Sequence, residues 1–379
     1  MIQHTLFLAL FWLSLVILVY TFLGYPFLIW CLARIFPHPA AKAAPPIYPT
    51  VSIVLIAHNE EARIVTRIEN LFGSIYPSDK LEIIIVSDGS TDATTAKITA
   101  LHDQRIHLMA RSERSGKASG LNSGLAAARG EIIIFADARQ RFAPEAIREL
   151  VHNFSDPKVG AVSGNHTMDA SVSNIGGGVD TYWRLEKMLR HGEARVDSSV
   201  GCTGAIYAIR RALYREIPPD TILDDVVIPM QIATQNYRVI FDPAAFCFDP
   251  QPSEPARERL RKRRTLAGNF QMLFRNPRWL LPWKNRIWWQ LISHKYLRIA
   301  APFFMLLLVL ANGALIDQPV YKFIFFGQCA FYGMALLGFI FSSIKTPLLS
   351  VPAGFVFLNF MTVGGFWNYL RGSYRGGRW

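Results

Sequence analysis

Acidic side chains stand directly after apolar stretches of this sequence. Asp88 and Asp137 each end such a stretch, and the pair Asp224-Asp225 follows Leu223. A carboxylate can accept hydrogen bonds from the edge of a nucleobase, or from the free amides at the start of a helix. The acids are therefore candidates either for a ligand site or for helix starts, and the elements around them bear on the choice.

Those elements alternate between strands and helices. Almost continuous apolar runs, typical of strands buried on both faces, cover 51–57, 83–86, 106–109 and 132–135, and helical spacing covers 64–72 and 117–128. This alternation predicts an α/β fold with a parallel, Rossmann-like sheet. Ligands of such sheets bind at the carboxyl ends of the strands, where His58-Asn59-Glu60, Asp88 and Asp137 would lie. The pattern therefore favours the ligand site.

Two common nucleotide motifs are absent from the sequence. No Gly-x-Gly-x-x-Gly follows the first strand, so a dinucleotide site is not expected. Gly116-Lys117 is not part of a phosphate-binding loop of the ATPase type, because Arg111 and Ala118 occupy two of its required positions. A lysine at a predicted helix start still suits a nucleotide phosphate.

Composition points to a membrane. Of the 379 residues 51% are hydrophobic and 18% are charged, whereas soluble domains carry about 25% charged residues. The net charge of +12 is concentrated near the hydrophobic ends and in one run of basic residues, Arg257, Arg259, Arg261, Lys262, Arg263 and Arg264. That distribution fits a membrane surface and a phosphate site rather than nucleic acid. The four cysteines form no metal-binding pattern.

The N-terminal region is predicted to span the membrane. Residues 5–32 carry no charged side chain, and this run is too long for a secretory signal peptide. Arg34 and Lys42 follow it, so positive-inside logic places the next residues in the cytoplasm.

Three further apolar runs close the sequence, at 299–316, 323–344 and 346–370. The third contains Pro347 and Pro352, so we leave open whether it spans, breaks or re-enters. Three spans would put the basic tail (Arg371, Arg375 and Arg378) outside, against the positive-inside rule. The stretch Trp279–Trp289 mixes Trp with Lys and Arg, which indicates a helix in the headgroup layer or, alternatively, one packed on the globular domain.

Five segments in order resemble glycosyltransferase family 2, in particular its membrane-bound branch with the cellulose, chitin and hyaluronan synthases. They are Ile56–Glu60, Ser87–Asp92, Gly116-Lys117 with Leu121-Asn122, Phe135–Ala138, and Leu223–Asp225. The resemblance implies a GT-A domain at 49–275. The other expected parts are a membrane helix at 1–35, a linker at 36–48, an interfacial segment at 276–297, membrane segments at 298–371 and a basic tail at 372–379.

The resemblance also implies roles for single residues. Asp225 would be the general base, supported by Asp224, and the loop Gly201-Cys202-Thr203-Gly204 would face the acceptor. Asp137 would hold Mg²⁺ or Mn²⁺. The donor would be bound by Asn59, Glu60, Asp88, Gly116, Lys117, Asp137, Arg261 and Arg264. Glu60 and the acidic pair also suit the first turn of a helix.

The sequence departs from the family pattern at three positions. Arg139 replaces the second acid of the Asp-x-Asp metal motif, and in the motif Gln-x-x-Arg-Trp the Gln is Arg261 and the Trp is Thr265. Mg²⁺ can bind through one or two carboxylates and substrate phosphates, so a metal at Asp137 is still expected. Arg139 can alternatively contact phosphate itself.

We therefore predict a multi-pass enzyme of the inner membrane with a cytoplasmic catalytic domain. It would transfer a sugar from a nucleotide-diphosphate sugar, UDP-sugar by resemblance, to a lipid or saccharide acceptor with inversion. One alternative is a processive exopolysaccharide synthase, with an export protein or further synthase subunit as partner. An alternative of another class is a degenerate membrane scaffold that binds nucleotide-sugar or a partner. Nucleic acid is not an expected partner.

Overall fold

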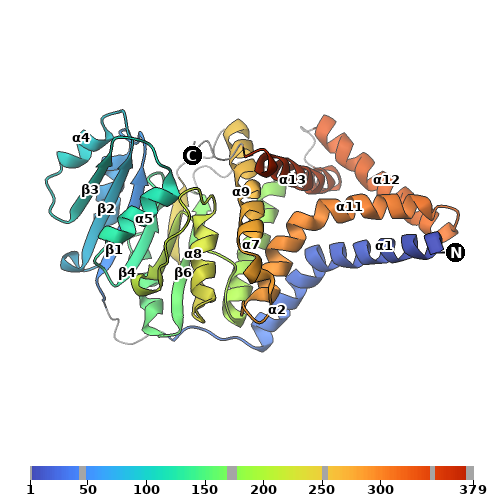
Figure 1. Ribbon diagram of the computed structural model, residues 1–379, viewed down its shortest axis with the longest axis horizontal. Coiled ribbons are helices and arrows are strands. Elements are labelled where there is room, and N and C mark those ends of the chain that lie inside the picture. Colours follow the sequence, from blue (N-terminus) through green and yellow to red (C-terminus); the bar gives the residue numbers. More distant parts are fainter. Residues whose placement is uncertain (1, 42–47, 169–176, 250–254, 342–345, 373–379) are drawn as a thin grey trace.

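A computed structural model describes residues 2–41, 48–168, 177–249, 255–341 and 346–372 (Figure 1). Lys42, Arg375 and Arg378 lie outside the described residues. Of Arg257 and Arg259 the structure describes the backbone alone.

One eight-stranded mixed sheet organises the globular part, in the order β3-β2-β1-β4-β7-β6-β8-β5. Its first four strands are parallel: β1 (Val51–Ala57), β2 (Leu81–Asp88), β3 (Ile106–Arg111) and β4 (Ile132–Ala136). Every residue of β1 and β4 is buried, as continuous apolar strands require. The predicted parallel sheet is therefore confirmed.

The other half of the sheet was not predicted. It consists of β5 (Arg141–Phe142), β6 (Val159–Met168), β7 (Ile206–Arg210) and β8 (Arg238–Asp249). β7 pairs antiparallel with β4 and with β6, whereas β6 pairs parallel with β8. This half extends the sheet from the parallel strands toward the membrane helices.

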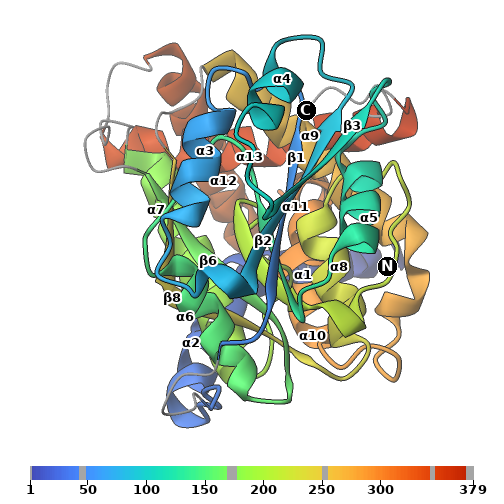
Figure 2. The ribbon, with the colours of Figure 1, turned by 90° about the vertical axis from the view of Figure 1, so that its left-hand side faces the viewer.

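Helices cover both faces of the sheet, so that a separate apolar core lies on each face. Figure 2 shows α3 and α5 on opposite sides of the parallel strands. The helices are α3 (Ile64–Phe72), α4 (Thr94–Thr99), α5 (Lys117–Ala127), α6 (Ala146–His152), α7 (Gly177–Val196), α8 (Asp224–Ala233) and α9 (Pro255–Arg275). Short 3₁₀ turns occur at Ser78–Lys80, Asn153–Ser155, Arg211–Leu213 and Pro277–Leu280.

Four helices in the described part of the chain are long and apolar enough to cross a membrane. The first joins α1 (Ile2–Val19), a π-helical turn (Tyr20–Gly24) and α2 (Tyr25–Ile35). In Figure 1, α1 and α11 (Leu297–Ala314) run side by side away from the sheet. At their far end Gln318 Nε2 lies 2.6 Å from His4 Nε2, and Trp12 donates a hydrogen bond to Tyr321. We call this far end the tip.

The second span begins earlier than the apolar pattern predicts. α10 (Trp288–Leu291), a π-helical turn (Ile292–Tyr296) and α11 (Leu297–Ala314) form one helix. Its first polar residues are paired with acids of α7, which hydropathy cannot indicate. In the predicted interfacial segment Trp279 is buried in one apolar core of the globular part while Trp283 is 73% exposed, and the place of this segment in the headgroup layer stays a prediction.

The last helix, α13 (Pro347–Leu370), is unbroken, so of the paths left open from the sequence a break at its prolines does not occur. Its start packs on the end of α12 (Pro319–Ile340), where a methyl group added at Gly338 would lie 2.6 Å from Leu349 O. Its end packs on α9, where the Tyr369 ring stacks on Phe274 at 5.4 Å. α13 packs against α9 and α12, and it lies beside α9 in Figure 1.

Candidate functional site

Three segments that are distant in the sequence meet at the carboxyl ends of the parallel strands. Asp137 follows β4, Lys117 opens α5 and Asp224 opens α8. Lys117 Nζ lies 3.1 Å from Asp137 Oδ1 and 3.4 Å from Asp224 Oδ2. Burial alone would lower the pKa of Lys117, but these two carboxylates and that of Asp225 raise it. A charged ammonium group therefore lies between two of the predicted site acids.

Asp225 stands beside Asp224 in the first turn of α8 and next to the loop Gly201–Gly204. Its carbonyl accepts a hydrogen bond from Cys202 N at 2.7 Å. A methyl group added at Gly204 would lie 2.9 Å from Asp225 Oδ2. Burial and the charge of Asp224 raise the pKa of Asp225 to about 6, although nearby cations lower it. A proton acceptor works best with a pKa near the working pH, so the environment of Asp225 suits a general base.

Helix α9 brings Arg264 to the same acids. Burial lowers the pKa of Arg264, while the charges of Asp224 and Asp225 raise it, so the guanidinium interacts electrostatically with both carboxylates. Gly268 allows α9 to approach the start of α8 closely, since a methyl group added at this position would lie 2.7 Å from Leu223 Cγ. Arg264 is therefore placed to balance negative charge in the site.

The other two positions of the family motif Gln-x-x-Arg-Trp, which are Arg261 and Thr265 here, face solvent. The side chains of Arg261 and Thr265 are exposed on α9. Thr265 accepts a hydrogen bond through its carbonyl from Asn269 Nδ2 at 3.2 Å. The expected contact of Arg261 with the donor stays a prediction.

Asp88, the predicted contact of the nucleobase, is buried at the end of β2. Its side chain is 0% exposed. One oxygen accepts a hydrogen bond from Ser115 N at 2.9 Å and lies 3.4 Å from Arg111 Nη1, and the other accepts from Gly116 N at 2.8 Å. Both oxygens are thus engaged beneath the loop that leads into Lys117, and Asp88 positions this loop. Its contact with a nucleobase stays a prediction.

Asn59 and Glu60 lie just after the end of β1, and their hydrogen bonds connect this segment to the residues that follow β2. Asn59, at φ +55°, accepts a hydrogen bond from Thr91 N at 2.8 Å. Glu60 N donates to Thr94 Oγ1 at 2.8 Å. Burial raises the pKa of Glu60, and Arg63 lowers it. Because α3 begins at Ile64 without a side-chain cap, both the helix-start role of Glu60 and its contact with a donor stay predictions.

Arg139, which replaces the second metal-motif acid, is paired with an acid of β8. Arg139 Nη2 lies 2.6 Å from Asp249 Oδ2, and His166 Nε2 lies 3.5 Å from the same oxygen. Burial would raise the pKa of Asp249, but His166 and Arg139 lower it. The alternative of a direct phosphate contact would require Arg139 to leave or share this acid. The sequence analysis missed Asp249, because the strand pairing that brings it near was not predicted.

A divalent cation fits this acid set only with help from a substrate. Among the described residues no three His, Cys, Asp or Glu side chains group closely enough to hold a metal. The Asp137 side chain is 39% exposed, and buried Asp224 Oδ2 has no hydrogen-bond donor. Carboxylate oxygens together with substrate phosphates are a set that Mg²⁺ accepts, so the residues present are compatible with a metal-diphosphate complex.

A buried charge cluster between α7 and the start of α11 was also missed. Glu186, Arg190 and Glu193 lie on one face of α7, and His294 and Lys295 face them. Their spacing on α7 follows the helical period. That periodic charge was the one signal in the sequence that could have revealed the cluster.

The comparisons with known proteins agree with this geometry. Residues 52–217 match the model of glycosyl transferase family 2. The chain is 26% identical over 218 residues to a probable glycosyltransferase, YdaM, of Bacillus subtilis, covering 54% of this chain and 51% of that protein. It is 25% identical over 254 residues to the poly-beta-1,6-N-acetyl-D-glucosamine synthase of Staphylococcus aureus strain COL, covering 65% and 55%. The chain thus spans about half the length of the curated relatives it matches.

Among solved structures, mannosyltransferase PcManGT from Pyrobaculum calidifontis, in complex with GDP-Man and Mn²⁺, has the same fold. The TM-score is 0.68 at 24% identity, covering 95% of this chain and 99% of that chain. The family match and the shared fold confirm the predicted recognition, fold class and enzyme class. The chain thus contains a glycosyl transferase family 2 domain at residues 52–217, and it has the GT-A fold.

Proposed function

We propose that this protein transfers a sugar from a UDP-sugar to a lipid or saccharide acceptor, with inversion at the anomeric carbon. The observation that carries the proposal is the cluster in which Lys117 lies between Asp137 and Asp224, next to Asp225. It combines fixed positive charge for a diphosphate with a carboxylate whose pKa suits proton transfer.

In the proposed reaction Asp225 takes the proton of an acceptor hydroxyl group. That oxygen attacks the anomeric carbon, and the bond from this carbon to the diphosphate oxygen breaks with its electron pair left on the UDP. Lys117 and Arg264 balance the charge of the leaving group, since both lie near the acids of the site. A divalent metal bound by Asp137, when present, would add charge stabilisation at the diphosphate.

Nucleotide release tests the proposal. The purified protein, with membrane lipids present, is offered a panel of UDP-sugars and GDP-sugars. We expect UDP to be released from one of them in an acceptor-dependent reaction. Release of GDP alone would reject the donor class, and release of neither nucleotide would favour the degenerate scaffold.

The proposed topology places the catalytic domain at the cytoplasmic face. Several cations cluster at the catalytic end of the bundle, including Arg34 over the Trp30 ring and Arg371 over the Trp367 ring. The tip has fewer cations among the described residues, Lys322 being one. With α13 along the inner surface, the first three spans leave Arg371 inside, in agreement with the positive-inside rule.

Labelling of introduced cysteines tests this orientation. In intact cells a membrane-impermeant maleimide should modify Asp317→Cys, at the tip, above the background of the unmodified protein. It should modify Asp79→Cys, on the catalytic domain, only after permeabilisation. The reverse pattern would contradict the proposed orientation.

A further inference from the structure

We propose that Arg190 is a positioning residue for the acceptor side of the site. Through Thr203 it fixes the loop Gly201–Gly204, and it is itself held by a buried charge network at the start of α11. The inference rests on the proposed function, because it assigns that loop to the acceptor.

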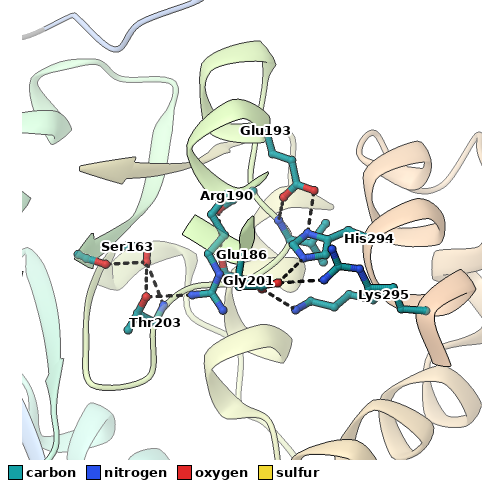
Figure 3. Close-up of polar contacts among 12 residues, drawn as sticks. Ser163, Glu186, Arg190, Glu193, Gly201, Thr203, His294 and Lys295 are labelled. Carbon is teal, nitrogen blue, oxygen red and sulfur yellow. Dashed lines mark hydrogen bonds and ion pairs between the residues drawn. The ribbon is translucent and has the colours of Figure 1, made fainter. Parts of the chain in front are cut away.

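Glu186 is the centre of the network (Figure 3). Its carboxylate lies 3.3 Å from Arg190 Nε and 3.0 Å from His294 Nε2. Lys295 Nζ lies 3.5 Å away and Arg298 Nη1 3.1 Å away. Burial would raise the pKa of Glu186, but His294, Lys295 and Arg190 lower it well below its usual range. One acid of the catalytic domain thus holds three side chains of the second membrane helix.

Glu193 extends the network to the first membrane helix. Its Oε1 accepts a hydrogen bond from Tyr25 OH at 2.5 Å and lies 2.8 Å from His294 Nδ1. Both ring nitrogens of His294 therefore face carboxylates, and the ring donates to both only in its protonated form. Glu193 Oε2 also accepts from Val200 N at 3.2 Å, one residue before the loop.

Arg190 carries this network to the loop. Its Nη1 donates to Thr203 Oγ1 at 2.9 Å, while Thr203 N donates to Ser163 Oγ at 2.9 Å. The next link is the bond from Cys202 N to the carbonyl of Asp225 at 2.7 Å. Continuous contacts therefore run from the membrane helices through Arg190 to the backbone of the proposed base.

A role limited to stability is the alternative explanation. Buried ion pairs are often no better for stability than apolar side chains of similar volume, so stability alone does not explain why this one ends on a loop rather than in the core. Burial and Asp224 raise the pKa of Asp225, and the charges of Lys117, Arg190 and Lys295 oppose this rise. The network is therefore suited to fixing the distance and charge between the acceptor loop and Asp225.

The test compares Arg190→Gln, Thr203→Val and the double variant in the full-length protein in lipid nanodiscs. A hydrogen bond to a charged group is worth roughly a 10- to 100-fold factor. We expect kcat to fall by about that factor in each single variant. The double variant should be little worse than Arg190→Gln, because both changes break one link. UDP affinity should stay within about threefold of wild type, since the donor side is untouched. The matched control is Arg105→Gln, which removes a charge from the half-buried Arg105–Asp103 pair at the start of β3 and should leave kcat unchanged.

The outcomes separate the two proposals. Transfer within about twofold of wild type in Thr203→Val would overturn the inference, and so would equal losses of kcat and UDP affinity in Arg190→Gln. Should Arg190→Gln fail to fold, Thr203→Val decides, because it removes a single hydroxyl group. A wild-type protein that transfers no sugar under any condition would instead overturn the proposed function.

Discussion

Replacing Asp225 by asparagine tests the base while leaving its surroundings almost intact. The amide has nearly the same shape, and the carbonyl of residue 225 still accepts the bond from Cys202 N. The change also removes the repulsion between Asp225 and Asp224. We therefore expect the variant to fold as well as wild type, with an unchanged or higher unfolding temperature.

The size of the kinetic effect follows from the lack of a substitute. General base catalysis contributes about 10²–10⁴ in rate. Asp224 is the nearest other carboxylate, but it lies 3.4 Å from Lys117 and is engaged with that cation. We therefore expect a fall of about 10³ in kcat, equivalent to about 4 kcal/mol of lost transition-state stabilisation.

The pH profile gives an independent check. Because the pKa of Asp225 is raised to about 6, the carboxylate becomes protonated below that pH and can no longer accept a proton. Wild-type kcat should therefore fall about tenfold per unit below pH 6, and this limb should be missing in Asp225→Asn. The assay measures release of UDP and, separately, binding of UDP by calorimetry. Turnover of the asparagine variant within about tenfold of wild type would refute the assignment of the base.

Three further predictions follow from the site. Chelation by EDTA should abolish transfer and Mg²⁺ or Mn²⁺ should restore it, because Asp137 is the expected ligand; full activity in chelator would show that cationic side chains suffice. Gly204→Ala should lower kcat roughly 10- to 100-fold without weakening UDP binding, because its methyl group would lie 2.9 Å from Asp225 Oδ2. Its control, Gly333→Ala, enters open space and should be neutral; a neutral Gly204→Ala would contradict the geometry. Finally, Thr265 stands where the family motif has tryptophan and offers no aromatic face to a sugar, and few helices surround any path across the membrane. The reconstituted protein should therefore make a discrete glycolipid or short product on gels, and a high-molecular-weight polymer inside vesicles would refute this and support the processive synthase.

Three of the parallel strands, β1, β2 and β4, were predictable because they are buried on both faces, whereas β3 is only half-buried. The run at 132–135, for example, corresponds to β4, which ends one residue later at Ala136. The antiparallel half of the sheet was not predictable, because β6 and β8 alternate apolar and polar residues irregularly and their pairing contains register shifts. Asp249 was missed for this reason.

Side-chain roles depended on contacts that sequence patterns do not contain. An acid at a strand end predicted ligand binding at Asp88, yet the following loop folds back and covers that carboxylate. From hydropathy the second span was predicted to begin at Ile299, because the polar residues His294 and Lys295 are unfavourable in a membrane helix. In the structure these two residues belong to the same helix, since they pair with Glu186 and Glu193. Long-range ion pairs of this kind leave almost no local signal.

The most direct test of the account is single-turnover transfer by the purified protein in lipid nanodiscs. Radiolabelled UDP-sugar, Mn²⁺ and a lipid extract are supplied, and the label is followed from nucleotide to acceptor in wild type and in Asp225→Asn. We expect label to move to an acceptor with one equivalent of UDP released in wild type, and to remain on the nucleotide in the variant, although the variant still binds UDP. Transfer at equal rates in both proteins, or no transfer from any nucleotide-sugar in wild type, would contradict the account.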